Sequence, residues 1–326
     1  MFMRPSVAPT PSTAELERKQ FADDVAYYLM LDPRQLPSRY FYDPLGSALF
    51  EAICHLPWYS ITRAERRLLE ARASDIMQRL PHVLTLVELG PGSGEKLSML
   101  VRGAGSTASL AVHLVDVSSA ALDLAARTLG VHDHVTVVPH QASYEAGLES
   151  LSRILAGRTL VLFLGSNIGN FDRPGADEFL RTIRRALAPG DALLIGADLV
   201  KPDRDLVLAY DDPLGVTAAF NRNLLVRVNR ELDADFDVDA FAHRAVWNAA
   251  ESRVEMHLVS TRSQRVRIAA SQLDLAFDAG EAIWTESSYK YRAAEIVAML
   301  QRAGFKEVDQ WIDESDGFAL TLVDAA

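Results

Sequence analysis

The middle of the chain alternates between short apolar runs and longer amphipathic segments. Apolar runs of strand length occupy 83–89, 110–117, 134–139, 159–165 and 192–197. Such nearly continuous runs are typical of parallel strands that are covered on both faces, and the segments between them have helical spacing. The alternation predicts an α/β fold with a doubly wound parallel sheet, whose ligands collect at the carboxyl ends of the strands.

The C-terminal part extends this sheet. A helical segment at 293–303 is followed by apolar runs at 307–312 and 318–323, which would bring the sheet to seven strands. Helices are also expected at 118–129 and 175–187, between strands of the central alternation.

Three helices are expected before the first strand. The first ends near Asp32-Pro33, because proline cannot continue a helix. Ser47 is expected to cap the second helix, which continues to His55. The third should open with Thr62 and Glu65, whose spacing matches a capping box.

The alternation stops near residue 201, where a helix-like segment and alternating strands suggest an inserted α+β lobe. We therefore expect a second lobe made from the N-terminal helices and this insertion. The predicted parts are a flexible tail at 1–12, a substrate-binding lobe at 13–64 and 201–288, and a cofactor-binding domain at 65–200 and 289–326.

Composition narrows the possible functions. The net charge of −11 and the lack of a Lys/Arg run argue against a nucleic-acid partner. The single cysteine, Cys54, rules out an internal disulfide and fits a reducing cytoplasm. No metal-ligand spacing, signal peptide or apolar run of membrane-spanning length is present, so we expect no metal and no membrane partner.

The strongest candidate for chemistry is the glycine turn after the first central strand. Glu88 precedes the segment 90–94, which has glycine at its first, third and fifth positions. The dinucleotide pattern would need glycine where Glu95 stands, whereas E-x-G-x-G-x-G resembles the first motif of class I S-adenosylmethionine (SAM) methyltransferases. Asp116 ends the second central strand, where a carboxylate can accept both ribose hydroxyls. On this motif alone, a dehydrogenase or a glycine turn without a ligand remains open.

Five blocks make a resemblance specific: RYFYDPLGSALFEAICHLPWYSITRAE, VELGPGSGEK, LGSNIGNF, AYDDPLGVTAAFNRN and TESSYKYR. In this order and spacing, the chain resembles the histidine Nα-trimethyltransferases of ergothioneine biosynthesis, which convert L-histidine to hercynine with SAM. The resemblance implies a class I methyltransferase fold, with the last strand antiparallel, and a second α+β lobe.

The resemblance also implies cofactor-binding residues. Gly90 and Lys96 match a SAM-contacting glycine and lysine, and Asp116 matches the ribose-binding acid. The family has an acid followed by an aromatic residue at the adenine, where this chain has Ser143 and Tyr144. Serine cannot replace the charged acceptor, although its hydroxyl or the Tyr144 N–H could still bond the base.

The resemblance also implies residues that bind the substrate amino acid, and these come from several blocks. Asn167 stands where the family usually has threonine. The matching residues are Tyr59 and Asn170 at the α-amino and carboxylate end, Tyr210 at the carboxylate, Glu286 and Ser288 at the imidazole nitrogens, Met256 beside the ring, and Tyr42 facing the amine. A neutral imidazole offers one donor and one acceptor, which suits a carboxylate paired with a hydroxyl.

Methyl transfer from a sulfonium needs no covalent enzyme intermediate, so positioning should supply most of the catalysis. We expect Tyr42 and Tyr59 to be the catalytic residues that orient the amine. The expected ligands are L-histidine and its mono- and dimethylated forms, bound by a monomer. Two alternatives stay open: Nα-methylation of another amino acid such as tryptophan, and a non-catalytic SAM-binding regulator.

Overall fold

The computed structural model describes residues 13–105, 109–153 and 157–325, so the predicted tail at 1–12 lies outside the described residues. The chain forms two compact units. Unit 1 comprises the chain up to Phe41 together with Ala218–Arg244 and Met256–Glu286, and unit 2 comprises Tyr42–Thr217, Ala245–Glu255 and the chain from Ser287.

Unit 2 contains the predicted seven-stranded sheet, which is confirmed. Six of its strands run in the same direction, and β13 runs antiparallel to its neighbours β6 and β12. In spatial order the strands are β12 (Phe305–Asp313), β13 (Phe318–Ala325), β6 (Ala192–Asp198), β5 (Arg158–Phe163), β2 (Val83–Leu89), β3 (Leu110–Asp116) and β4 (Val135–Gln141). The strand order switches direction between β2 and β5, and because these strands and β3 are parallel, their carboxyl ends lie at one edge of the sheet.

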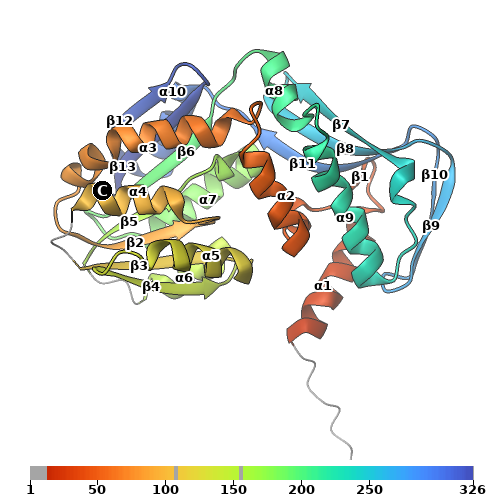
Figure 1. Ribbon diagram of the computed structural model, residues 1–326, viewed down its shortest axis with the longest axis horizontal. Helices are drawn as coiled ribbons and strands as arrows, with labels where there is room; N and C mark the ends of the chain where they lie inside the picture. The colour runs from red at the N-terminus through yellow and green to blue at the C-terminus, as the bar shows by residue number, and fades with distance from the viewer. Residues whose placement is uncertain (1–12, 106–108, 154–156, 326) are drawn as a thin grey trace, which may run out of the picture. The chain divides into compact units, whose positions relative to one another are not determined.

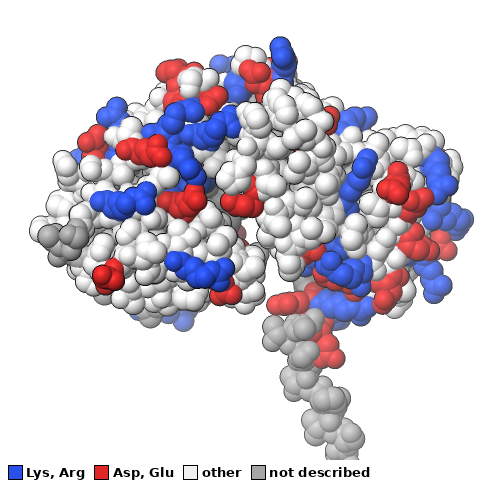
Figure 2. All heavy atoms as spheres, in the orientation of Figure 1, with Lys and Arg blue, Asp and Glu red and all other residues white. Residues whose placement is uncertain are grey.

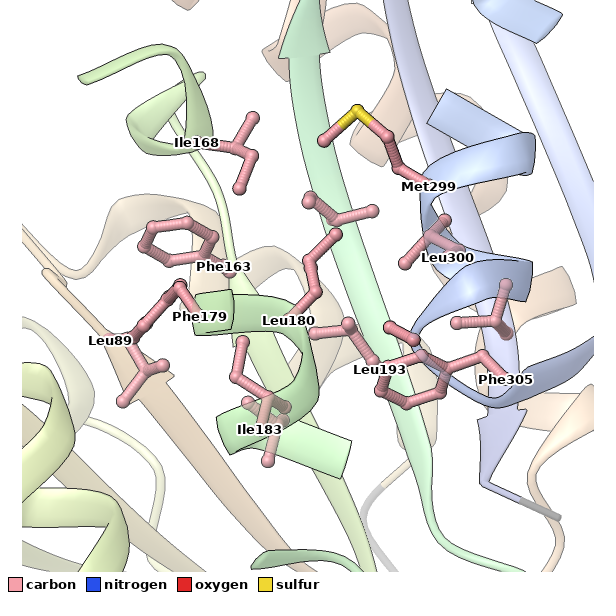
Figure 3. Close-up of a cluster of buried hydrophobic side chains, with 14 of the residues drawn as sticks. Leu89, Phe163, Ile168, Phe179, Leu180, Ile183, Leu193, Met299, Leu300 and Phe305 are labelled. Atoms are coloured by element: carbon pink, nitrogen blue, oxygen red, sulfur yellow. The ribbon is translucent and has the colours of Figure 1, made fainter. Parts of the chain in front are cut away.

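Helices cover both faces of this sheet (Figure 1). One layer packs α3 (Ser60–Arg79), α4 (Glu95–Ala104) and α5 (Ser119–Leu129) side by side. The other layer contains α6 (Tyr144–Leu151), α7 (Arg173–Ala186) and α10 (Ala293–Arg302). Figure 3 shows the core under this second layer, where Phe179 and Leu180 of α7 and Leu300 of α10 lie against the strands. The remaining helices of unit 2 are α2 (Pro44–Cys54), α8 (Asp203–Tyr210) and the short η2 (Asn167–Asn170).

Unit 1 has its own aromatic core. Phe41 stacks on Phe220 with ring centroids 4.6 Å apart, and Phe241 packs against both Phe236 and Phe277. Its elements include α1 (Thr13–Tyr28), β1 (Arg34–Gln35), η1 (Ser38–Phe41), η3 (Val238–Ala240), β9 (Gln264–Ile268) and β10 (Leu273–Phe277). The helix α9 (Val216–Leu232) and the strands β7 (Phe241–Asn248), β8 (Arg253–Ser260) and β11 (Ala282–Tyr289) have residues in both units. The expected α+β character of the insertion is confirmed.

Two helix starts differ from the predictions. The helix α2 begins at Pro44, and Asp43 rather than Ser47 caps it, with Oδ1 accepting from the N–H of Gly46 at 2.7 Å. Proline at the first helical position is favourable because its missing N–H would have no partner there. The predicted capping box of Thr62 and Glu65 is wrong, because α3 already begins at Ser60 and has no side-chain cap. The Glu65 side chain instead forms an ion pair with Lys96.

The surface and the helices bear on possible partners. Acidic and basic side chains are interspersed on the face shown in Figure 2, rather than separated into fields of one sign. None of the described helices combines the length and the apolar character needed to cross a bilayer. No group of three metal-ligating side chains occurs among the described residues.

The division into a substrate-binding lobe and a SAM-binding domain stays a prediction.

Candidate active site

The glycine turn follows β2 directly and has the geometry of a ligand cradle. Gly90, Gly92 and Gly94 have φ of 75°, 53° and 76°, which side chains rarely tolerate. A Cβ on Gly92 would meet no atom within 4 Å, so the main chain there is open to a ligand. On Gly90, a Cβ would lie 2.6 Å from Tyr144 Oη and 2.9 Å from Asn167 Nδ2.

Lys96 lies in the first turn of α4, beside this cradle. Its Nζ is 2.6 Å from Oε2 of Glu65, and its side chain keeps 25% of its surface exposed. Burial disfavours the ammonium, but the Glu65 carboxylate outweighs this effect and raises the pKa of Lys96. Lys96 is therefore a fixed cation with part of its surface available to an anionic ligand group.

Glu65 reaches the sheet from α3 through a gap left by a glycine. A Cβ on Gly196 of β6 would lie 2.1 Å from Glu65 Oε1, so only glycine leaves room for the carboxylate. Both carboxylate oxygens accept from the N–H of Gly165, at 2.8 and 2.9 Å. Glu65 thereby links the loop after β5 to Lys96.

Glu88, the last polar residue of β2, is fully buried, and its Oε2 has no hydrogen-bond partner among the described residues. Burial raises the pKa of Glu88 to about 8, against the lowering effect of Lys96. A buried acid of this kind holds its proton near neutral pH.

This pKa predicts how stability depends on pH. The pKa of an unperturbed glutamate is 4.5, so the folded chain binds this proton more tightly than the unfolded chain. The resulting stabilisation is complete below pH 4.5 and is lost as pH rises toward about 8. We expect Glu88→Gln to flatten this part of the pH profile in denaturant unfolding, whereas Glu95→Gln, at an exposed position of α4, should keep the wild-type slope. An unchanged slope in Glu88→Gln would contradict the assignment.

Asp116 and the Ser143–Tyr144 pair lie at the carboxyl ends of β3 and β4. Burial raises the pKa of Asp116, while the N–H of Ser118, 2.8 Å from Oδ1, counteracts this effect. Ser143 caps α6, with Oγ accepting from the N–H of Ala146 at 3.3 Å. The Tyr144 ring packs against Phe163, with its hydroxyl close to Gly90.

These residues fit SAM. The open main chain at Gly92 admits the ligand, and the Lys96 cation suits the carboxylate of its methionine part. Asp116 ends the strand next to β2, where a carboxylate can accept from ribose hydroxyls. Ser143 and Tyr144 stay a predicted contact with the adenine.

A second group of predicted residues forms a line of aromatic rings within unit 2. Tyr42 lies edge-on to Phe50 at 5.6 Å between centroids, and Phe50 contacts Tyr59 at 6.3 Å. Tyr59 in turn contacts Tyr210 at 6.2 Å. The structure thus brings together three predicted tyrosines from two separate sequence blocks, with Tyr42 and Tyr59 in one block and Tyr210 in the other.

Tyr210 and Ser288 meet through their hydroxyl groups. The O–H of Tyr210 donates to Ser288 Oγ at 2.7 Å, and Lys290 Nζ donates to both oxygens. The loop that carries Asn170 packs here as well, because a Cβ on Gly169 would lie 2.7 Å from the carbonyl oxygen of Tyr289. Asn170 itself is exposed at the end of η2.

Met256 and Glu286 belong to unit 1. Met256 is buried on β8, and its carbonyl oxygen accepts from the Thr285 hydroxyl at 3.0 Å. The carbonyl oxygen of Glu286 accepts from Trp284 Nε1 at 2.8 Å. Glu286 is the last residue of unit 1 on β11, and Ser288 lies two residues further along the same strand, in unit 2.

Sequence reasoning missed the charged residues behind these contacts. The sequence pattern predicts a helix-cap role for Glu65, and it does not indicate the contacts of Lys290 and Asp198. Each of the three is almost completely buried in unit 2. A lysine in the strand-like block TESSYKYR was the available signal, because lysine is rarely buried without a partner.

Comparison with known proteins agrees with this geometry. A model of the family described as "Histidine-specific methyltransferase, SAM-dependent" matches residues 21–325. The chain is 43% identical to a histidine N-alpha-methyltransferase of Mycolicibacterium smegmatis, over 95% of each chain. It is 44% identical to one of Mycobacterium tuberculosis, over 92% of this chain and 93% of the relative. It also matches 37% of ergothioneine biosynthesis protein 1 of Schizosaccharomyces pombe, at 29% identity over 85% of this chain. The chain therefore belongs to the family of SAM-dependent, histidine-specific methyltransferases.

Proposed function

We propose that this enzyme transfers three methyl groups in succession from SAM to the α-amino nitrogen of L-histidine, giving hercynine for ergothioneine biosynthesis. The observation that carries the proposal is the 43% identity with a histidine N-alpha-methyltransferase, which extends over 95% of both chains. The ligand cradle at Gly90–Gly94 and the hydroxyl groups of Tyr210 and Ser288 support it from the geometry.

SAM supplies an electrophilic methyl group on a sulfonium. Lys96 binds the carboxylate of its methionine part, Asp116 binds the ribose, and Ser143 with Tyr144 lies at the adenine. Tyr42 and Tyr59 orient the substrate amine so that its lone pair faces the methyl carbon. Packing in the aromatic line limits side-chain motion, so most of the rate enhancement comes from holding the two reactants in line.

The same proposal assigns the remaining contacts to the amino acid. Tyr59 and Asn170 hold its α-amino and carboxylate end, and Tyr210 bonds the carboxylate. Glu286 and Ser288 bond the two imidazole nitrogens, with Met256 beside the ring. The indole of tryptophan has one N–H donor and no acceptor nitrogen, so it would leave one of these polar groups unpaired, and the site should favour histidine.

Mass spectrometry after incubation with SAM tests the function. We expect histidine to gain three methyl groups and tryptophan to gain none. Methylation of tryptophan in preference to histidine would favour the alternative amino-acid substrate. SAM binding without methylation of either amino acid would favour a regulator.

Removal of the Glu286 carboxylate tests the imidazole contact. We expect Glu286→Ala to weaken histidine binding by more than about 1 kcal/mol, through loss of a hydrogen bond to a charged group. Calorimetric titration with histidine measures this, and the conservative Glu286→Gln variant should lose less. Equal affinities in the wild type and both variants would remove Glu286 from the site.

We further propose that residues 65–200 and 289–326 form the SAM-binding domain, and that 13–64 and 201–288 form the substrate-binding lobe. On the same basis we propose a monomer in the cytoplasm, a setting in which the single cysteine stays reduced. The mono- and dimethylated histidines are further ligands, and nucleic acids and membranes are not partners.

A further inference from the structure

Asn167, the first residue of η2, has a side chain that lies between two glycine turns of unit 2. Gly90 follows β2 and Gly165 lies in the loop after β5, and these two strands are parallel neighbours in the sheet. A Cβ on Gly90 would lie 2.9 Å from Asn167 Nδ2, and a Cβ on Gly165 would lie 3.7 Å from Asn167 Oδ1. The amide group therefore spans the carboxyl ends of two adjacent strands at the cofactor cradle.

The two ends of this amide have different neighbours. The ammonium of Lys96 and the oxygen of Asn167 both border the space that a side chain at Gly165 would fill, with Nζ 3.1 Å from the Cβ position. At the other end, the Tyr144 hydroxyl and the Asn167 amide nitrogen both border the Cβ position of Gly90. An amide dipole is stabilised when its oxygen lies toward a cation, so this orientation is favourable.

The oxygen of Asn167 is available to a ligand. Across the described ranges of the chain, the Asn167 side chain has no hydrogen-bond partner, and it is only half-buried. The carboxylate of Glu65 cannot take its place, because Glu65 is completely buried and its oxygens are used by Lys96 and by the N–H of Gly165. A ligand at this turn therefore meets one cation and one neutral acceptor.

We propose that Asn167 is a further cofactor-binding residue, whose Oδ1 accepts a hydrogen bond from the α-ammonium in the methionine part of SAM. This inference rests on the proposed contact between Lys96 and the carboxylate of the same part. In an α-amino acid both charged groups are attached to one carbon, so the groups that bind them must lie close together, as Lys96 and Asn167 do beside Gly165. A neutral oxygen suits this place, because a carboxylate would repel the carboxylate of SAM.

Three ligands with the same adenosine and thioether separate the two contacts. S-adenosylhomocysteine has both charged groups, its deaminated analogue lacks only the ammonium, and its decarboxylated analogue lacks only the carboxylate. We expect the wild type to bind the deaminated analogue about tenfold or more weakly than S-adenosylhomocysteine, because a hydrogen bond to a charged group is lost. Calorimetric titration measures each Kd, and equal values for these two ligands overturn the inference.

Substitution of Asn167 assigns this preference to one side chain. Asn167→Leu removes the acceptor at nearly the same side-chain size, and its Kd for S-adenosylhomocysteine should rise about tenfold. Its Kd for the deaminated analogue should stay within about twofold of the wild-type value, which also shows that the variant is folded. Asn167→Asp keeps an acceptor oxygen and should keep the preference, because these two ligands carry the same carboxylate.

Gln141→Leu is the matched control. It removes an exposed amide at the carboxyl end of β4, whose nitrogen donates to the carbonyl oxygen of Val117 at 3.2 Å. The ratio of the two Kd values should remain that of the wild type. An Asn167→Leu enzyme with the wild-type ratio overturns the inference, and so does an Asn167→Asp enzyme that has lost it. If Asn167→Leu does not fold, Asn167→Ala replaces it with the same expectation.

The decarboxylated analogue distinguishes a failure of the underlying contact. If the wild type binds it as tightly as S-adenosylhomocysteine, the proposed contact of Lys96 is wrong, whatever the deaminated analogue shows. The methylation assay is independent of both results. An enzyme that has the expected preference for the ammonium but does not methylate histidine would support the role of Asn167 and overturn the proposed function.

Discussion

Replacing Glu65 with alanine is expected to destabilise the folded chain by about 3 kcal/mol or more, as is usual when one partner of a buried ion pair is removed. The variant would leave the Lys96 ammonium without its carboxylate and the Gly165 N–H without its two acceptor oxygens. Lys96 would also lose the contact that holds it beside the glycine turn, so SAM binding should weaken. Urea unfolding and calorimetry with SAM measure the two effects.

Two further variants isolate the carboxylate. Glu70→Ala removes the same side chain from an exposed position of α3, and should change stability by less than about 0.5 kcal/mol. Glu65→Gln keeps the shape and one acceptor oxygen for Gly165, so its loss should be intermediate. If Glu65→Ala were as stable as Glu70→Ala, the buried pair would not contribute to folding as we infer.

Glu65 also shows where sequence patterns mislead. Its spacing from Thr62 fits a capping box, which is a purely local signal. Its actual partners are the N–H of Gly165 and the ammonium of Lys96, and space for it depends on Gly196 of a third segment. Nothing local in the sequence encodes those distances, so a tertiary contact outweighed the local pattern.

The strands were predicted best where burial on both faces leaves a continuous apolar run. The predicted strand 83–89 has the same bounds as β2, because glycines end it abruptly. The helix α6 was not predicted, since it is short and contains Gly147. A Cβ at Gly147 would lie 2.4 Å from Val115, so this glycine allows the helix to approach β3 and is not a helix breaker.

For the candidate site, the resemblance supplied the individual residues and the structure supplied the relations among them. Tyr42 and Tyr59 come from one block and Tyr210 from another, and the three lie in one aromatic line through Phe50. Asn167, the departure from the family pattern, has its amide nitrogen 2.9 Å from the Cβ position of Gly90. The substituted residue therefore lies at the cofactor turn, a location that its position in the sequence did not indicate.

Because the space beside Gly90 is crowded, Gly90→Ala is expected to lower the free energy of unfolding strongly. The positive φ of 75° costs an alanine about 1–3 kcal/mol, and the new methyl group would lie 2.6 Å from Tyr144 Oη. Tyr144 cannot simply turn away, because its ring packs against Phe163 and Phe179. Overpacking should add about 1–3 kcal/mol, for a total loss of about 2–6 kcal/mol in the free energy of unfolding.

A double-mutant cycle separates the two causes. Gly92→Ala places an alanine at a positive φ of 53°, where its Cβ would meet no atom within 4 Å. This variant should therefore show the cost of backbone strain alone. In the Tyr144→Phe background the oxygen nearest to the new methyl group is gone, and Gly90→Ala should cost about 1 kcal/mol less than in the wild type. An equal cost of Gly90→Ala in both backgrounds would mean that the tyrosine hydroxyl does not restrict the turn. In that case the main-chain conformation and the Asn167 amide, 2.9 Å from the Cβ position, would be what requires glycine at the start of the SAM cradle.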